Sequence, residues 1–368
     1  MACGTPWTRS FEGRKGGERM SGAMLEVKDF SVSFDTYAGE VQAVRNVSFH
    51  VGRGEVVAIV GESGSGKSVL TQSLVKLLPS PPARVKEGSK VFIEGVDISD
   101  YSFNQLRTIK GSKVAYIFQD PMTSLNPLAK IGAQVTEGIL CHRIMSKKAA
   151  YEYAVELLRD AEIQSPERRM EQYPHELSGG MRQRVMIAIA LAMKPSLLIA
   201  DEPTTALDVT TQSQILGTLK ALNTERGMSI ILITHDMGIV AGIAQRVIVM
   251  YGGKTVERGG SQEIFEKSRH PYTRSLLGSI PRLDADKGHD LDFIVGSPPD
   301  MLNPPKGCPF SPRCKFAMAC CGVVPPEEIT LSTTHASWCW LLHPGAKRVY
   351  EDFRRQYPDL YENGAALP

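Results

Sequence analysis

Apolar runs rich in β-branched residues recur along the first two thirds of the chain. Residues 25–34 alternate between apolar and polar positions, which predicts a strand with one buried face. Further apolar runs predict strands at residues 41–51, 56–60, 91–93, 114–118, 197–202 and 230–234. Because several of these runs are apolar at almost every position, we expect a sheet that is covered on both faces.

Helical periodicity fills most of the intervals between the predicted strands. It covers residues 69–78, runs from 131 to 172 without a strand signal, and returns in a helix that ends near residue 193. A proline-rich loop is expected at residues 79–90. Strands that alternate with helices predict an α/β fold with a doubly wound sheet, and the region of about 130–180 is predicted to form a helical subdomain.

Composition limits the possible partners. The 368 residues carry 42 lysines and arginines against 40 aspartates and glutamates, a net charge of +2, so we expect no nucleic-acid partner. The longest apolar run, residues 185–193, has nine residues and is far shorter than the roughly 20 that cross a bilayer. Residues 1–23 lack an apolar stretch and predict a loose extension, neither a signal peptide nor an anchor.

A predicted strand and helix are joined by a glycine-rich turn, Gly-Glu-Ser-Gly-Ser-Gly-Lys-Ser at residues 61–68. Its glycines let the backbone curl so that N–H groups and the helix N-terminus face a polyphosphate. Lys67 is predicted to reach the β- and γ-phosphates, and Ser68 to hold a magnesium ion through its hydroxyl. The flanking strand and helix favour a P-loop over an incidental glycine-rich turn. The residues predicted to cradle the nucleotide are Gly61, Ser63, Gly64, Ser65, Gly66, Lys67 and Ser68.

Polar side chains follow three of the other predicted strands, where ligands collect in doubly wound sheets. Asp201 is predicted to hold magnesium through water, and Glu202 to orient or deprotonate the water that attacks the γ-phosphate. Gln119 is predicted to touch magnesium, and His235 to hydrogen-bond the γ-phosphate. Each has an ordinary alternative when taken alone: acids that begin a loop, a solvated turn glutamine and a structural histidine.

Two further features would complete a nucleotide site. Tyr37 lies between the first two predicted strands, where its ring could stack on adenine, with Phe34 as a rival and an ordinary hairpin tyrosine as the alternative. Ser178, Gly179 and Gly180 open a long helix and predict a second anion-binding helix terminus, with a plain N-cap as the alternative.

The order of these motifs resembles the ATP-binding cassette ATPases over roughly residues 25–280. In this resemblance the motifs are Walker A at 61–68, the Q-loop glutamine at Gln119, the signature at 177–183, Walker B with its catalytic glutamate at 198–202, the D-loop at 206–208, the switch histidine at His235 and the aromatic A-loop residue at Tyr37. The family implies that two such domains enclose two ATP molecules. Each ATP is then held between the Walker A motif of one domain and the signature of the other.

Two shorter stretches, residues 119–127 and 270–273, narrow the resemblance to the oligopeptide and dipeptide importer ATPases, the D-type subunits of the Opp and Dpp systems. This implies a peptide-uptake ATPase that uses ATP and Mg²⁺ and is peripheral at the cytoplasmic face of the cell membrane. Its implied partners are a second, F-type ATPase subunit in a hetero-dimer, two transmembrane permease subunits and an extracytoplasmic solute-binding protein. Importers of nickel or other solutes share these sequences. A soluble cassette protein that acts on ribosomes or DNA is the other alternative, although such proteins usually carry two cassettes or a long coiled-coil insertion.

The same family implies an iron–sulfur site near the C-terminus. Beyond residue 280 the composition changes, because 12 of the 23 prolines and 5 of the 7 cysteines lie in 281–368. This change predicts a loop-rich appendage to an ATPase domain at 24–280, held by cross-links or a metal and lacking long periodic segments. The cysteines that match the family's order, and by that resemblance hold a 4Fe-4S cluster, are Cys308, Cys314, Cys321 and Cys339.

Three alternatives stay open for these cysteines. Zinc accepts four thiolates equally well, although zinc sites usually pair cysteines two to four residues apart and these spacings are five, six and seventeen residues. Cys320 directly precedes Cys321 and could replace it as the third ligand. A set of buried free thiols is the last alternative. Cys3 and Cys141 lie outside the group and are expected to be reduced.

Overall fold

The computed structural model describes residues 22–142, 145–205, 207–279 and 294–356. The expected N-terminal extension therefore lies almost wholly outside the described residues.

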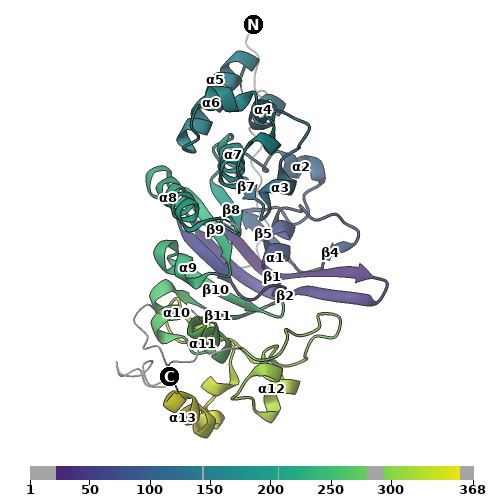
Figure 1. Ribbon diagram of the computed structural model, residues 1–368. Helices are drawn as coiled ribbons and strands as arrows, with labels where there is room; N and C mark the ends of the chain where they lie inside the picture. Colours follow the sequence, from purple (N-terminus) through teal and green to yellow (C-terminus); the bar gives the residue numbers. More distant parts are fainter. Residues whose placement is uncertain (1–21, 143–144, 206, 280–293, 357–368) are drawn as a thin grey trace.

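The main sheet contains the strands β3 (Val56–Val60), β7 (Val114–Ile117), β8 (Leu197–Asp201), β9 (Ser229–Thr234), β10 (Arg246–Tyr251), β11 (Lys254–Gly260), β12 (Ile329–Thr330) and β13 (Ala336–Ser337). These eight strands have the order β12-β13-β11-β10-β3-β9-β8-β7, and Figure 1 labels β7, β8, β9, β10 and β11. The strands from β10 to β7 are parallel, and the other three are antiparallel additions at one edge.

The central strands are buried on both faces, as their continuous apolar sequences predict. Every residue of β3, β8 and β9 is buried. In the parallel ladders Val60 pairs with Thr234, and Ile233 pairs with Asp201, so these strands end level with one another. The residues that follow them along the chain consequently emerge at one edge of the sheet.

A second, five-stranded antiparallel sheet covers one face of this core. Its strands are β1 (Ala23–Thr36), β2 (Gly39–Gly52), β4 (Ala83–Val85), β5 (Lys90–Ile93) and β6 (Val96–Asp97). Alternate residues of β3 divide between two cores: Val57 and Ile59 pack with the antiparallel sheet, whereas Val56, Ala58 and Val60 pack with the helices. Helix α1 (Lys67–Leu74) ends four residues before the predicted limit, and the predicted loop 79–90 contains the short strand β4.

The predicted helical region forms helices throughout its described part, and they lie at the top of Figure 1. Its helices are α4 (Ile131–Cys141), α5 (Lys147–Asp160), α6 (Pro166–Met170) and the first turns of α7 (Gly179–Leu191), with the 3-10 turn η1 (Pro174–Glu176). Ser146 begins α5 by accepting a hydrogen bond from the Ala149 N–H at 3.3 Å. The other helices of the ATPase region are α2 (Phe103–Arg107), α3 (Pro121–Ser124), α8 (Val209–Arg226), α9 (Met237–Ile243), α10 (Ser261–Lys267) and α11 (Pro271–Gly278).

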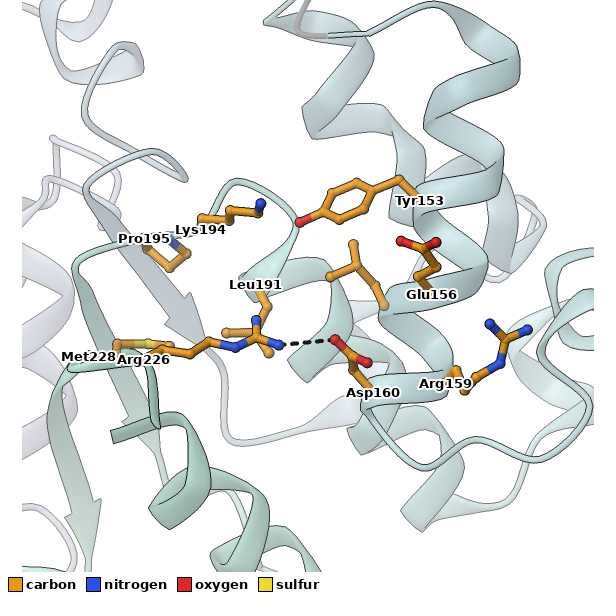
Figure 2. Close-up of a pocket in the computed structure, with 10 residues that line it drawn as sticks. Tyr153, Glu156, Arg159, Asp160, Leu191, Lys194, Pro195, Arg226 and Met228 are labelled. Atoms are coloured by element: carbon orange, nitrogen blue, oxygen red, sulfur yellow. Dashed lines mark hydrogen bonds and ion pairs between the residues drawn. The ribbon is translucent and has the colours of Figure 1, made fainter. Parts of the chain in front are cut away.

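A cavity of about 510 Å³ lies where the helical region meets the sheet core (Figure 2). Tyr153 of α5 and Met228 before β9 line it from opposite sides. An ion pair of 3.0 Å between Asp160 and Arg226 crosses the boundary, but both side chains are about half exposed. Such a pair contributes roughly 0.2–1 kcal/mol, so it ties the two regions together only weakly.

The cysteine-rich segment packs onto the ATPase core through its own short elements. Besides β12 and β13 it contains η2 (Ser311–Arg313), α12 (Ala319–Val323), η3 (Trp340–Leu342), η4 (Pro344–Ala346) and α13 (Lys347–Gln356). The segment also contains α13, a ten-residue helix that was not predicted. Its Tyr350 and Phe353 are buried against Cys339, Leu341 and Leu342, because an amphipathic helix of this length can bury one face beside a small core.

Candidate nucleotide site

The glycine-rich turn runs from the end of β3 to the start of α1, and its backbone requires glycine at two positions. Gly61 and Gly66 have φ values of 148° and 96°. A Cβ atom at Gly61 would collide with the Met250 carbonyl oxygen, and one at Gly66 with the Ala43 carbonyl oxygen. The predicted cradle is therefore built of close backbone contacts that other residues would break.

Lys67 lies inside this turn. Its Nζ donates to the carbonyl oxygens of Gly61 at 2.7 Å and Glu62 at 2.9 Å, and only 5% of the residue is exposed. Burial lowers the pKa of Lys67, whereas the nearby carboxylates of Glu202, Asp201 and Glu62 raise it. A phosphate that enters the turn would replace two neutral acceptors with a charged one, which is the stronger partner for an ammonium group.

Asp201, at the end of β8, lies beside the start of α1. Its carboxylate accepts hydrogen bonds from the Ser68 hydroxyl at 2.9 Å and from the Tyr116 hydroxyl at 2.8 Å, and the residue is 1% exposed. Burial raises the pKa of Asp201, and the hydrogen bonds from Tyr116 and Ser68 oppose that effect. A hydroxyl and a carboxylate this close fit a magnesium ion, which binds oxygen ligands and retains waters.

Glu202 has a left-handed backbone with φ of 46°, a conformation that costs a residue with a Cβ roughly 1–2 kcal/mol. Its carboxylate accepts hydrogen bonds from Gln119 Nε2 at 3.0 Å and from the Thr205 hydroxyl at 2.8 Å. His235 Nδ1 lies 3.2 Å from the other carboxylate oxygen. Burial raises the pKa of Glu202, but hydrogen bonds from Thr205 and His235 outweigh it and leave the pKa below its usual value. The group is thus ionised at neutral pH, as a base must be.

The other predicted site residues lie apart from this group. Tyr37 is fully exposed between β1 and β2, so adenine stacking stays a prediction. Ser178 caps α7 by accepting the Met181 N–H at 3.3 Å, and it and Gly179 are exposed. Among the described residues neither Tyr37 nor Ser178 hydrogen-bonds to the turn or to the acids. Of the predicted D-loop, residue 206 lies outside the described part, and Asp208 caps α8.

Several residues of the site were not predicted. Tyr116 and Thr205 contact the two acids, and Arg313 and Tyr272 contact Glu62. Tyr116 is the one polar residue in an otherwise apolar predicted strand, which is a usable signal. Gln119 touches Glu202 in this structure, so its contact with magnesium stays a prediction.

The four predicted iron ligands occur in one part of the fold. Cys308, Cys321 and Cys339 are buried, Cys314 is partly buried, and none of them forms a disulfide. Burial raises the pKa of Cys308 to about 11 and that of Cys314 to about 12. In the described part of the chain, no group of three or more histidine, cysteine or acidic side chains is arranged to hold a metal ion. The cluster stays a prediction.

Comparison with known proteins shows the family. The profile described as ABC transporter matches residues 44–205, and the profile described as oligopeptide/dipeptide transporter, C-terminal region, matches residues 256–321. The oligopeptide transport ATP-binding protein OppD of Bacillus subtilis (strain 168) is 53% identical over 326 residues, which cover 89% of this chain and 91% of that protein. The chain belongs to the oligopeptide/dipeptide group of the ABC transporter family.

Other comparisons agree with this ABC ATPase assignment. OppD of Escherichia coli (strain K12) is 47% identical over 314 residues, which cover 85% of this chain and 92% of that protein. The dipeptide transport ATP-binding protein DppD of Bacillus subtilis is 50% identical over 318 residues, covering 86% of this chain and 94% of that protein. A dimeric ATP-binding cassette, MJ0796, solved in a post-hydrolysis state with ADP and Pi, has a TM-score of 0.59 and 30% identity, covering 65% of this chain and 99% of that one. The predicted family and fold class are confirmed.

The first prediction concerns Glu202. Glu202→Gln is expected to bind ATP normally and to lower the hydrolysis rate of the assembled ATPase by about 10²- to 10⁴-fold, because the base is lost while the phosphate contacts remain. Phosphate release and ATP affinity would be measured together. Glu225→Gln, at an exposed position of α8, is the matched control. Hydrolysis at the wild-type rate by Glu202→Gln would remove Glu202 from this role.

The second prediction concerns Lys67. Lys67→Ala is expected to weaken ATP binding by about 10- to 150-fold, since a charge-assisted hydrogen bond to the phosphates is removed. Titration with a fluorescent ATP analogue measures the affinity, and Lys220→Ala on an exposed face of α8 serves as the control. Unchanged affinity in the Lys67 variant would contradict the cradle assignment.

Proposed function

We propose that this chain is the ATP-hydrolysing subunit of a peptide importer. The ATPase role is supported by one observation: Lys67, the Ser68–Asp201 pair and Glu202 lie together at one edge of the main sheet. The peptide part is supported by the relatives, which are named oligopeptide and dipeptide transport ATP-binding proteins and match nearly their whole length.

In the proposed reaction each group has a separate task. Lys67 and the N–H groups of the turn bind the β- and γ-phosphates. Magnesium held by Ser68 and Asp201 would supply positive charge to the phosphate oxygens. The ionised Glu202 orients the attacking water and accepts its proton, and its contacts with Thr205 and Gln119 fix the direction of the carboxylate. His235, beside Glu202, donates to the γ-phosphate.

The signature segment serves a different ATP molecule in this proposal. Ser178, Gly179 and Gly180 stand at the start of α7, in the helical region, and Ser178 and Gly179 are exposed. The N-terminus of α7, a helix of 13 residues, offers N–H groups and the positive end of the helix dipole to an anion. We infer that they contact the ATP bound by the Walker A motif of a second, F-type ATPase subunit. The dimeric state of the similar cassette MJ0796 supports an ATPase dimer.

The surface beside Gln119 is the proposed contact with two transmembrane permease subunits. Met122 and Leu128 follow Gln119 and are 63% and 88% exposed, so they offer apolar surface to a partner protein. None of the helices among the described residues has the length and apolar character needed to cross a membrane. We propose a peripheral location at the cytoplasmic face of the cell membrane, below permeases that receive peptide from an extracytoplasmic solute-binding protein.

The third prediction tests this function. ATP hydrolysis is expected to be weak for the isolated chain and to rise when the chain is assembled with its partner ATPase and permeases in lipid. A peptide-loaded binding protein is expected to raise it further. The rate of phosphate release per chain, measured across a range of chain concentrations, checks this expectation. Strong hydrolysis that is independent of concentration in the isolated chain, or recovery of the chain with ribosomes or DNA, would contradict the proposal.

We further propose that Cys308, Cys314, Cys321 and Cys339 hold a 4Fe-4S cluster in the C-terminal segment. Burial raises the pKa of Cys339. The thiolates of the other three cysteines raise it further, because like charges repel. A bound cluster would relieve both effects, because metal binding keeps cysteines deprotonated. The proposed boundary of this segment, near residue 280, falls outside the described residues.

Backbone N–H groups near these sulfurs support the same ligand set. The Phe310 N–H stabilises the Cys308 thiolate, the Phe316 N–H that of Cys314, and the Leu341 N–H that of Cys339. The Met318 N–H lies 3.4 Å from the Cys321 sulfur. Hydrogen bonds to cysteine sulfurs tune iron–sulfur clusters. The interactions of Cys308 and Cys314 with Cys321 favour Cys321 over Cys320 as the third ligand.

The fourth prediction separates these two adjacent cysteines. Protein purified without oxygen from iron-replete cells is expected to be brown and to contain iron and acid-labile sulfide. Cys321→Ser is expected to lose most of both, whereas Cys320→Ser keeps them, because Cys321 acts electrostatically on Cys308, Cys314 and Cys339, while Cys320 acts on Cys321. Stoichiometric zinc in colourless wild-type protein would contradict the cluster, and loss of iron from Cys320→Ser alone would reverse the ligand choice.

A further inference from the structure

An arginine of the C-terminal segment reaches the Walker A loop. Arg313, the last residue of η2, donates from Nη1 to the Glu62 carboxylate at 2.6 Å and to the Tyr251 hydroxyl at 3.0 Å. Its Nε and Nη2 donate to the carbonyl oxygens of Val295 and Ile294, each at 3.0 Å. Only 7% of the side chain is exposed. All three nitrogens of the guanidinium group thus have acceptors, which fixes the group in one orientation.

Glu62 is also held through its main chain. Its N–H donates to the Tyr272 hydroxyl at 2.7 Å, and Tyr272 is fully buried. The Tyr272 ring lies 4.5 Å from the Tyr251 ring, and Phe310, from the same segment as Arg313, packs on both at 5.3 and 5.2 Å. Aromatic contacts of this kind stabilise a fixed arrangement. The C-terminal segment therefore holds Glu62 in two ways: Arg313 pairs with its carboxylate, and Phe310 packs on Tyr272, which accepts its N–H.

Glu62 lies in the Walker A loop beside Lys67, so its contacts affect the binding of ATP. Its carbonyl oxygen accepts a hydrogen bond from Lys67, and its negative charge acts on Lys67. An unpaired carboxylate in the phosphate-binding loop would repel a polyphosphate and would bind Lys67 in competition with it. With Arg313 beside it, the Glu62 carboxylate is held in an ion pair and its charge is compensated.

We propose that Arg313 is a positioning residue for ATP. By pairing with Glu62, Arg313 keeps uncompensated negative charge out of the Walker A loop and leaves Lys67 available to the phosphates. Tyr272 holds the main chain of Glu62. This proposal rests on the ATP-binding role proposed above and deepens it, because it makes the C-terminal segment a determinant of nucleotide affinity. The contact joins residues 251 positions apart in the sequence.

The fifth prediction tests the pairing by a double-mutant cycle in the full chain. A fluorescent ATP analogue is titrated into each variant. Arg313→Met is expected to bind it about 10- to 100-fold more weakly, on the scale of a lost charge-assisted contact. Glu62→Gln removes the charge that Arg313 neutralises, so this variant is expected to bind nearly as well as wild type. Arg313→Met combined with Glu62→Gln is expected to recover most of the affinity. Arg348→Met, at an exposed position of α13, is the control.

Kinetics in the assembled complex separate positioning from loss of structure. Arg313→Met is expected to raise the KM for ATP and to leave kcat close to wild type, because Glu202 and its partners are untouched. A fall in kcat together with a raised KM, without recovery by Glu62→Gln, would show a structural role only and would overturn the proposal. A wild-type chain that binds the analogue, together with an Arg313→Met variant that binds it equally, overturns this proposal alone. A wild-type chain that binds no ATP analogue overturns the proposed function as well.

Discussion

The site depends on one constraint: adjacent parallel strands of the main sheet end at the same edge. The glycine-rich turn follows β3, and His235 follows β9. Asp201 ends β8 with Glu202 directly after it, and Gln119 follows β7. These four strands are neighbours in that order. Because their ladders are in register, residues separated by more than a hundred positions in the sequence emerge at one edge. A slip of one residue would require both buried faces of such a strand to repack, which close-packed cores tolerate poorly.

The second constraint is the burial of opposite charges at this edge. Lys67 and Asp201 are both buried, and an isolated buried charge costs several kcal/mol. Each is therefore surrounded by partners: carbonyl oxygens for Lys67, and the hydroxyls of Ser68 and Tyr116 for Asp201. A site whose polar groups are already oriented reorganises little when a charged substrate arrives. The same logic extends outward to Glu62, whose charge is matched by Arg313 from another part of the chain.

The local parts of this arrangement could be predicted from the sequence, and the long-range parts could not. A strand, a glycine turn and a helix are adjacent in the sequence, so the cradle is visible in residues 61–68, and the acids of β8 are visible because they end an apolar run. The contacts of Arg313 and Tyr272 with Glu62 depend on how the C-terminal segment folds back on the core, which no local pattern encodes. The helix α13 was not predicted, because it lies in a proline-rich segment whose composition indicates loops, although Val349, Tyr350 and Phe353 recur at helical spacing. Cys308 and Cys321 lie in the main hydrophobic core, a placement that spacing alone does not reveal.

The proposed mechanism requires the Walker A cradle of one subunit and the signature of another to enclose the same ATP. Native mass spectrometry of this chain mixed with its partner ATPase, in the presence of magnesium and ATP under conditions that block hydrolysis, measures subunit number and bound nucleotide in one spectrum. We expect a dimer that forms only with ATP and carries two nucleotides. A chain that stays monomeric with a full complement of bound ATP, or a dimer whose formation is independent of ATP, would contradict it.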